Sequence, residues 1–172
     1  MTQQNSKSQV ELLKWMLEDV RKVTIAGVEH LTKEQLFEPP IEGEYPIGSY
    51  LMHFCEVDIG WLQVISGTEQ PDEIKKRAHY GTWYDSGPDF APPKEPIQVN
   101  EYFEVMKITR NNFLEYISSL KDSDLEEIIT RKRGEVVKTY TKKWIIYHIL
   151  EHEAHTRGQI FMLIRKAGWK RK

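Results

Sequence analysis

The chain has little cysteine, no long apolar run and no excess of positive charge, and each of these shortages excludes a class of protein. Cys55 is the only cysteine among 172 residues, so an intrachain disulfide and a zinc cluster built from several cysteines are both excluded. No apolar stretch approaches the roughly 20 residues that a membrane-spanning helix requires. The polar N-terminus lacks the apolar segment of a secretory signal peptide, so we expect a cytoplasmic protein without a membrane partner.

The charge balance argues against nucleic acid as a partner. The chain carries 24 basic and 26 acidic side chains, a formal net charge of −2, whereas surfaces that bind nucleic acid through bulk charge are strongly basic. The length and the 40% hydrophobic composition suit one globular domain with its own core. Because we find no internal repeat and no linker, residues 1–172 are interpreted as a single domain.

Apolar residues at helical spacing predict four long helices. The pattern covers residues 10–31, 46–67, 100–120 and 142–167, and Thr141 is placed to cap the last of these segments. Four amphipathic helices of this length predict an all-α fold of the four-helix-bundle type.

The connections between these helices carry their own signals. Residues 68–97 are predicted to form a long loop that holds five of the eight prolines, and loops of that length are more often functional than idle. Its aromatic run at residues 80–84 would wall a pocket or fold back on the bundle. Capping-box patterns at residues 32–35 and 123–126 predict short helical turns, and residues 128–140 predict a small hairpin or an extended link.

Three of the six histidines lie on one stripe of the fourth predicted helix. At about 100° per residue, His148, His152 and His155 fall within roughly 60° of one another around the helix axis. Imidazole is the commonest transition-metal ligand, and ligands three or four residues apart on a helix can reach one ion. His53 stands among apolar residues of the second helix. One histidine from that helix and two from the fourth would form a metal site with open coordination positions.

The chain resembles the DinB/YfiT-like family of four-helix-bundle proteins over almost its whole length. In the second helix the resemblance rests on His53, Glu56 and the Trp61-Leu62 pair. In the fourth helix it rests on a series that reads His148, His152, Thr156 and Arg157-Gly158-Gln159. The resemblance implies a divalent metal, held by one histidine of the second helix and by two positions of the fourth. Carried over, these positions are His53, His152 and Thr156.

Thr156 departs from the family pattern, because a threonine hydroxyl is a poor ligand for zinc or nickel beside imidazoles. Three possibilities stay open. The ion is held by His53, His152 and His155, which we rank first, or by His53, His148 and His152. In the third, metal binding is lost and the histidines line a polar pocket.

Two classes of function follow from these possibilities. The resemblance implies thiol-dependent S-transferases, in which a small thiol such as bacillithiol attacks a small electrophile, as well as hydrolases and isomerases. Glu56 and Tyr80 are the candidates for proton transfer. Glu56 would either hold an imidazole or act as a general base, although a surface position is equally compatible. The alternative is a non-catalytic, metal-free binding or interaction module in the stress response. A homodimer paired through helix faces is expected in either case.

Four further side chains near these positions receive structural interpretations. Glu151 and Glu153 are predicted to face solvent on the fourth helix. Cys55 lies about 160° round the second helix from His53 and is predicted to be a small buried residue. His79, in the long loop, is predicted to be exposed.

Overall fold

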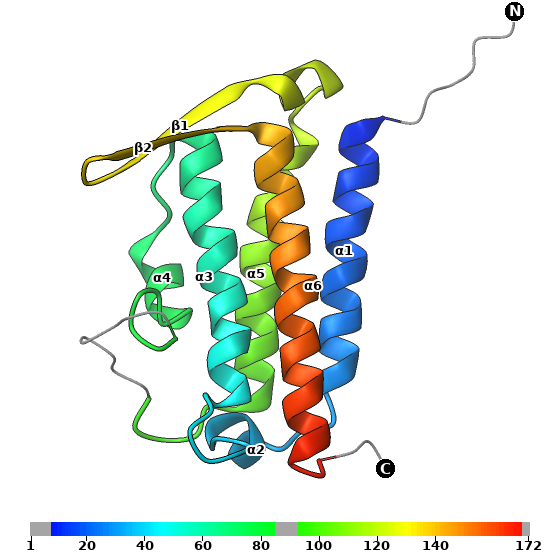
Figure 1. Cartoon of the computed structure of the whole chain (residues 1–172), viewed down its shortest axis with the longest axis vertical. Helices are drawn as coiled ribbons and strands as arrows, with labels where there is room; N and C mark the ends of the chain where they lie inside the picture. Colours follow the sequence, from blue (N-terminus) through cyan, green and yellow to red (C-terminus); the bar gives the residue numbers. More distant parts are fainter. Residues whose placement is uncertain (1–7, 85–92, 170–172) are drawn as a thin grey trace, which may run out of the picture.

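Four long helices form the frame of the protein (Figure 1). The computed structural model describes residues 8–84 and 93–169. The long helices are α1 (Gln9–Val28), α3 (Ile47–Ser66), α5 (Val99–Ser118) and α6 (Lys142–Lys166). The predicted four-helix bundle is confirmed, and the helix ends lie within a few residues of the predicted ones. None of the helices in the described residues is long and apolar enough to span a membrane.

Local capping interactions explain where the helices begin and end. The Thr141 hydroxyl accepts a hydrogen bond from the backbone N–H of Trp144 at 3.1 Å, which confirms the predicted cap of α6. The predicted capping box at Thr32 and Gln35 is also present, and it starts the short helix α2 (Lys33–Phe37). Gly67 ends α3 at φ 69°, a left-handed conformation that favours glycine.

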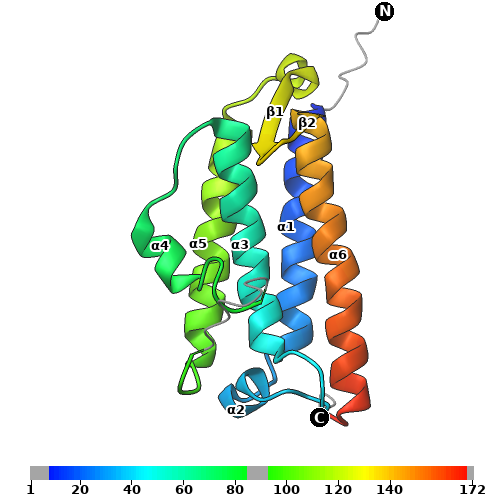
Figure 2. The same ribbon diagram turned by 60° about the vertical axis from the view of Figure 1, so that its left-hand side comes forward.

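The order of the helices around the bundle makes a long crossover necessary. Both α1 and α3 pack against α5 and α6, so α1 and α3 face each other across the bundle. Figures 1 and 2 show that α3 and α5 run in the same direction, so the chain must return along the bundle between Ser66 and Val99. This crossover contains a short helix, α4 (Asp72–Arg77), where the sequence predicted only loop. Residues 85–92 of the predicted loop lie outside the described residues.

One end of the bundle carries a two-stranded hairpin, which confirms the hairpin rather than the extended link (Figure 1). Strands β1 (Ile128–Arg133) and β2 (Val136–Thr141) pair antiparallel and lead directly into α6. A 3-10 turn, η2 (Asp122–Glu126), precedes them. The predicted short helical turn is present, but Ser123 does not cap it, because the Asp124 carboxylate accepts the hydrogen bond from the backbone N–H of Lys121 at 2.9 Å.

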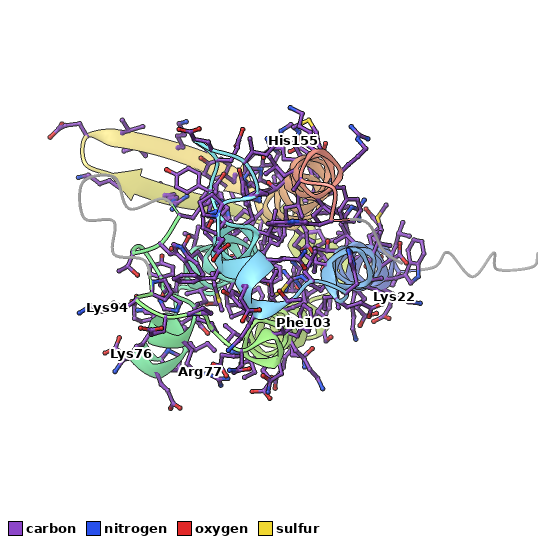
Figure 3. The ribbon with its side chains drawn as sticks, turned by 90° about the horizontal axis from the view of Figure 1, so that it is seen from below. Lys22, Lys76, Arg77, Lys94, Phe103 and His155 are labelled. Atoms are coloured by element: carbon purple, nitrogen blue, oxygen red, sulfur yellow. The ribbon has the colours of Figure 1, made fainter. Side chains whose placement is uncertain are left out.

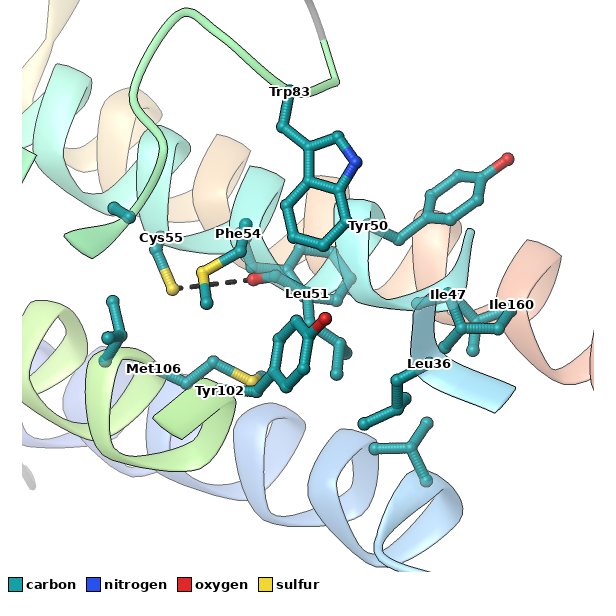
Figure 4. Close-up of a cluster of buried hydrophobic side chains, with 14 of the residues drawn as sticks. Leu36, Ile47, Tyr50, Leu51, Phe54, Cys55, Trp83, Tyr102, Met106 and Ile160 are labelled. Carbon is teal, nitrogen blue, oxygen red and sulfur yellow. Dashed lines mark hydrogen bonds between the residues drawn. The ribbon is translucent and has the colours of Figure 1, made fainter. Parts of the chain in front are cut away.

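The core confirms the structural interpretation of the single cysteine. Cys55 is fully buried, and its thiol donates to the backbone carbonyl of Leu51 (Figure 4). Trp83 from the crossover and Tyr102 from α5 pack in the same cluster. Burial raises the pKa of the Cys55 thiol to about 12, so the thiol stays protonated at neutral pH.

A buried ionic network joins the four long helices at the centre of the bundle. It consists of Arg21 from α1, Asp58 from α3, Arg110 from α5 and Glu153 from α6, all at most 5% exposed. Arg110 bonds both carboxylates, at 2.9 Å to Asp58 and 2.7 Å to Glu153. Arg21 bonds the same two groups at 3.1 and 2.9 Å. Each arginine also donates to a backbone carbonyl of another helix: Arg21 donates to a carbonyl of α5, and Arg110 donates to a carbonyl of α1.

The network overturns the prediction that Glu153 faces solvent. A charged residue on a helix is usually exposed, but here two arginines from other helices supply the opposite charge that allows burial. Burial alone raises the pKa of the Glu153 carboxyl, but the charges of Arg21 and Arg110 outweigh it and lower the pKa to about 2. Glu153 is therefore ionised inside the protein at every physiological pH.

Candidate functional site

A pocket of about 470 Å³ lies beside α3 and α6, between the crossover and the hairpin. Its wall combines apolar residues of α3 with polar side chains from four elements. The polar lining residues are His53, Glu56, Tyr80, Arg131, His148 and His152.

Two histidines meet in this pocket from neighbouring helices. His53 on α3 and His152 on α6 face each other, with 3.3 Å between their Nε2 atoms and 5.1 Å between ring centroids. Two imidazole nitrogens bound at about 2.0–2.1 Å to one tetrahedral zinc ion lie about 3.3 Å apart. The spacing of the pair therefore fits a shared divalent cation without movement of either helix.

Glu56 fixes the orientation of His53. It lies one turn later on α3 and is 9% exposed, and its Oε2 accepts from His53 Nδ1 at 3.0 Å. Its other oxygen accepts from the backbone N–H of Gly81 in the crossover. With the Nδ1 proton held by Glu56, the lone pair of His53 is on Nε2 and points at His152. The sequence left several roles open for Glu56, and its position in the structure is that of a carboxylate that holds an imidazole.

His148 lies in the same pocket, one turn of α6 before His152. Its ring stacks on Trp144 with centroids 4.8 Å apart, meets the ring of Trp61 edge-on, and lies 6.0 Å from the ring of His152. Burial lowers the pKa of both imidazoles, for His152 to about 4 with further lowering by the adjacent histidines. Both rings are therefore neutral at pH 7, as a metal ligand must be.

His155 lies away from the pocket. Its side chain is exposed, with Nε2 3.3 Å from the amide nitrogen of Gln159, and Figure 3 labels it on the outer side of α6. Thr156, at the position where the family pattern has a ligand, is buried. Helical spacing ranked His155 ahead of His148, whereas the structure brings His148 to the pair and leaves His155 outside. The two residues lie only about 20° apart around the helix axis, so spacing along α6 cannot tell which of them lies beside α3.

The third position of the expected site is not assembled as the side chains lie. Within residues 8–84 and 93–169, no group of three or more histidine, cysteine, aspartate or glutamate side chains is arranged to hold one ion. His53 and His152 fit a metal, whereas the ring of His148 stacks on Trp144 and lies 6.0 Å from the ring of His152. The donor set that fits is thus the His53–His152 pair, with the imidazole of His148 nearby.

The crossover covers one side of the histidine pair. Tyr84 packs on His53 with ring centroids 4.4 Å apart, and Tyr80 lines the pocket, so part of the aromatic run does wall a pocket. Trp83 of the same run is buried in the core. His79 is half-buried against Trp83, with centroids 5.3 Å apart, so the prediction that it is exposed is wrong.

Sequence reasoning missed the contribution of the hairpin. The guanidinium of Arg131 on β1 lies 4.8 Å from the centroid of the Trp61 ring, which it covers. Tyr140 on β2 packs edge-on against Trp61 and stacks on Trp144. These aromatic contacts hold the hairpin over the pocket. The sequence predicted a hairpin or an extended link without a register, and it is the register of the structure that places Arg131 and Tyr140 on one face.

Comparisons with known proteins place the chain in a family. It belongs to the DinB superfamily, whose family model matches residues 16–160. The uncharacterized protein YizA of Bacillus subtilis is 24% identical over 147 residues, which cover 86% of this chain and 80% of YizA.

Solved structures share the fold at low sequence identity. A conserved protein from Enterococcus faecalis has a TM-score of 0.72 at 11% identity, covering 96% of this chain and all of that one. A DinB-like protein from Bacillus cereus has a TM-score of 0.62 at 18% identity, over 92% of this chain and 89% of its own. YfiT from Bacillus subtilis, described as a probable metal-dependent hydrolase with an unusual four-helix bundle topology, has a TM-score of 0.63 at 16% identity. That match covers 99% of this chain and 94% of YfiT.

Proposed function

We propose that this protein is a metal-dependent enzyme that acts on a small molecule in the pocket between α3 and α6. His53 and His152 hold one divalent cation, zinc or nickel, and His148 is the nearest imidazole to complete the site. The observation that carries this proposal is the 3.3 Å separation of the two Nε2 atoms, with Glu56 bonded to the far nitrogen of His53. A carboxylate behind a ligating imidazole is the usual support of a protein metal site.

The chemistry of such a site is the activation of a nucleophile. A divalent cation bound there would lower the pKa of a coordinated thiol or water. If the coordinated nucleophile is a thiol, the protein is an S-transferase that acts on a small electrophile. If it is water, the protein is a hydrolase, as the description of YfiT suggests for that protein. Both oxygens of Glu56 are already engaged, so it positions His53, and Tyr80, which also lines the pocket, is a candidate to bond substrate.

Metal content tests the proposal directly. Wild type and the His53→Ala, His148→Ala, His152→Ala and His155→Ala variants are purified without a tag and measured by elemental mass spectrometry. We expect about one equivalent of metal in wild type and in His155→Ala, and its loss in His53→Ala and His152→Ala. An intermediate content in His148→Ala would identify it as the third ligand. Circular dichroism checks that each variant is folded.

Activity then separates the two reactions. Metal-loaded protein is assayed with a small thiol plus a chloronitrobenzene electrophile, and separately with ester and amide substrates in the absence of thiol. Turnover only with thiol supports the S-transferase, and turnover without it supports the hydrolase. Wild-type protein that stays metal-free after incubation with zinc and nickel would overturn both the S-transferase and the hydrolase proposals.

A second candidate function follows from Thr156. This residue is buried where the family pattern has a ligand, and no described trio of side chains is ready to hold an ion. In that case His53 and His152 share a hydrogen bond in a metal-free pocket, and the protein is a non-catalytic ligand-binding module. Metal-free wild type that still binds small molecules in the pocket would support this function.

A further inference from the structure

Residues 79–84 of the crossover, here called the cover, lie over one side of the histidine pair. Tyr84 packs on the ring of His53 with centroids 4.4 Å apart, and the backbone N–H of Gly81 donates to Glu56. Glu56 in turn accepts from His53 Nδ1 at 3.0 Å. Movement of the cover away from α3 would therefore uncover the ring of His53 and break a bond to the carboxylate that orients it.

One side chain anchors the cover in the core. Trp83 is fully buried and packs on Tyr102 of α5, which is also fully buried, with 6.1 Å between ring centroids (Figure 4). Yet the indole Nε1–H of Trp83 and the hydroxyl of Tyr102 have no hydrogen-bond partner in the part of the chain that the structure describes. Burial of a polar group without a partner is unfavourable, because water would bond it. Two polar groups at the anchor therefore favour a form in which water reaches them.

The packing around Tyr102 shows that its hydroxyl is accommodated by the fold. A Cβ added to Gly48 on α3 would lie 2.5 Å from the hydroxyl oxygen and 2.7 Å from the carbonyl oxygen of Leu36. Any residue larger than glycine at position 48 would collide with both atoms. Glycine is unfavourable within a helix, so this room for the hydroxyl has a cost of its own.

The backbone of the cover is strained where it leaves α4. His79 has φ 50°, the one positive φ of a residue other than glycine among the described residues. Such a left-handed conformation is uncommon for a residue with a side chain and is found where a segment serves a function. By contrast, Ile74 and Ala78 of the preceding helical segment are buried in the core. The cover can therefore pivot at His79 while α4 stays in place.

We propose that the cover is a lid on the histidine pocket. It opens about His79 as Trp83 leaves the core, which brings water to the indole N–H and to the Tyr102 hydroxyl and admits small molecules to the histidine pair. When the lid closes, the bond from Gly81 to Glu56 forms again. The opening depends on the packing of the crossover alone, whereas the reaction of what enters rests on the function proposed above.

Hydrogen exchange measures the opening in protein stripped of metal with a chelator. The indole N–H of Trp83 and the amide of Gly81 are followed by NMR in deuterated water, and the indole signal is assigned from its absence in Trp83→Phe. We expect both protons to exchange through one opening, at least about ten-fold faster than the slowest amides of α3, which exchange when the whole protein unfolds. Exchange of these two protons only with global unfolding would overturn the lid.

Tyr102→Phe is the sharpest test, because it removes a polar group that only the open form hydrates. Closing becomes more favourable, so exchange at Trp83 and Gly81 should slow about ten-fold, whereas a loss of packing would speed it. Tyr116→Phe is the matched control on the same helix. Its hydroxyl donates to the carbonyl of Ile65 at 2.8 Å, so this variant should leave the exchange unchanged. Unchanged or faster exchange in Tyr102→Phe would overturn the proposal.

Chemical modification tests whether the opening controls access. Metal-free protein is treated briefly with diethyl pyrocarbonate, which modifies neutral imidazoles, and His53 and the exposed His155 are compared by mass spectrometry. Trp83→Ala lacks the anchor and should raise the rate at His53 at least about ten-fold. Tyr102→Phe should lower it by the same factor as the exchange, and His155 should be unaffected in both. Equal rates at His53 in all three proteins would show that the cover does not control access.

The outcomes separate the lid from the proposed function. Both measurements use metal-free protein, so a lid that fails them leaves the metal site untouched. A wild-type protein that never takes up metal but shows these changes would support the lid while the metal proposal fails. Circular dichroism checks that Trp83→Ala is folded, and Tyr102→Phe, which keeps its ring, decides the question if it is not.

Discussion

Two polar clusters of this protein are built around adjacent residues of α6, and they differ in one respect. Glu153 points into the centre of the bundle, where Arg21 and Arg110 bond both of its oxygens. His152 points into the pocket, where its Nε2 meets His53 and its Nδ1 has no hydrogen-bond partner among the described residues. The first cluster is closed, because each of its charged groups forms ion pairs with other groups of the same cluster. The second leaves the Nδ1 of His152 without a hydrogen bond among the residues that the structure describes.

The closed cluster also determines the geometry of the open one. A buried carboxylate tied to two arginines fixes the rotation of α6 about its axis, because any turn would strand a charge. With Glu153 turned inward, the next side chain round the helix, His152, faces α3 and meets His53. The ionic network is thus the structural reason that a site can form between these two helices.

The largest effect is expected from opening the closed cluster. Glu153→Gln keeps the volume of the side chain but leaves Arg21 and Arg110 with one carboxylate, and loss of one partner of a buried ion pair costs about 3–5 kcal/mol. Urea denaturation should show this drop in the free energy of unfolding. Glu151→Gln, two residues earlier and exposed, should change it by no more than about 0.5 kcal/mol. A loss for Glu153→Gln as small as that of the control would contradict the role of the network.

The same carboxylate predicts how stability depends on pH. The pKa of Glu153 is about 2 in the folded protein, below its ordinary value of 4.5. The stabilisation is therefore complete above about pH 4.5 and is lost as the pH falls toward 2. The difference in unfolding free energy between wild type and Glu153→Gln should shrink over that interval. A difference that stays constant from pH 6 to pH 3 would show that the charge of Glu153 does not stabilise the fold.

A change in the open cluster should affect binding more than stability. In Glu56→Gln, the amide cannot accept from both Gly81 N–H and His53 Nδ1–H with the present tautomer, so the orientation of His53 is lost. We expect metal affinity to fall about 10–100-fold while unfolding free energy falls by about 1–3 kcal/mol. Competition with a chromogenic chelator measures the affinity. An unchanged metal affinity would show that Glu56 does not support the metal site.

The smallest effect is expected for the exposed histidine. His155→Ala removes a side chain whose hydrogen-bond partner is the amide of Gln159 on the surface of α6. Unfolding free energy should stay within about 0.5 kcal/mol of wild type, and metal content should not change. Loss of metal in this variant would restore His155 as a ligand and would require α6 to rotate in the metal-bound protein.

Local signals were sufficient for the main elements of the fold. Apolar periodicity located four helices, the Thr141 cap located the start of the last one, and the β-branched residues around Gly134 located the hairpin. The same signals missed α4, which is only six residues long and lies in a segment rich in proline. The capping pattern at Ser123 pointed to the wrong side chain, because the carboxylate of the neighbouring Asp124 accepts the capping hydrogen bond instead.

The sequence by itself determined the bundle, the burial of Cys55 and the stripe of histidines on α6, because these depend on spacing along one helix. The tertiary structure decided that Glu153 is buried, that His148 rather than His155 shares the pocket with His53, and that Arg131 faces it. Each of these depends on which helix or strand lies opposite and how it is rotated. Spacing of about 100° per residue defines a face of one helix, but the partner of that face exists only after packing.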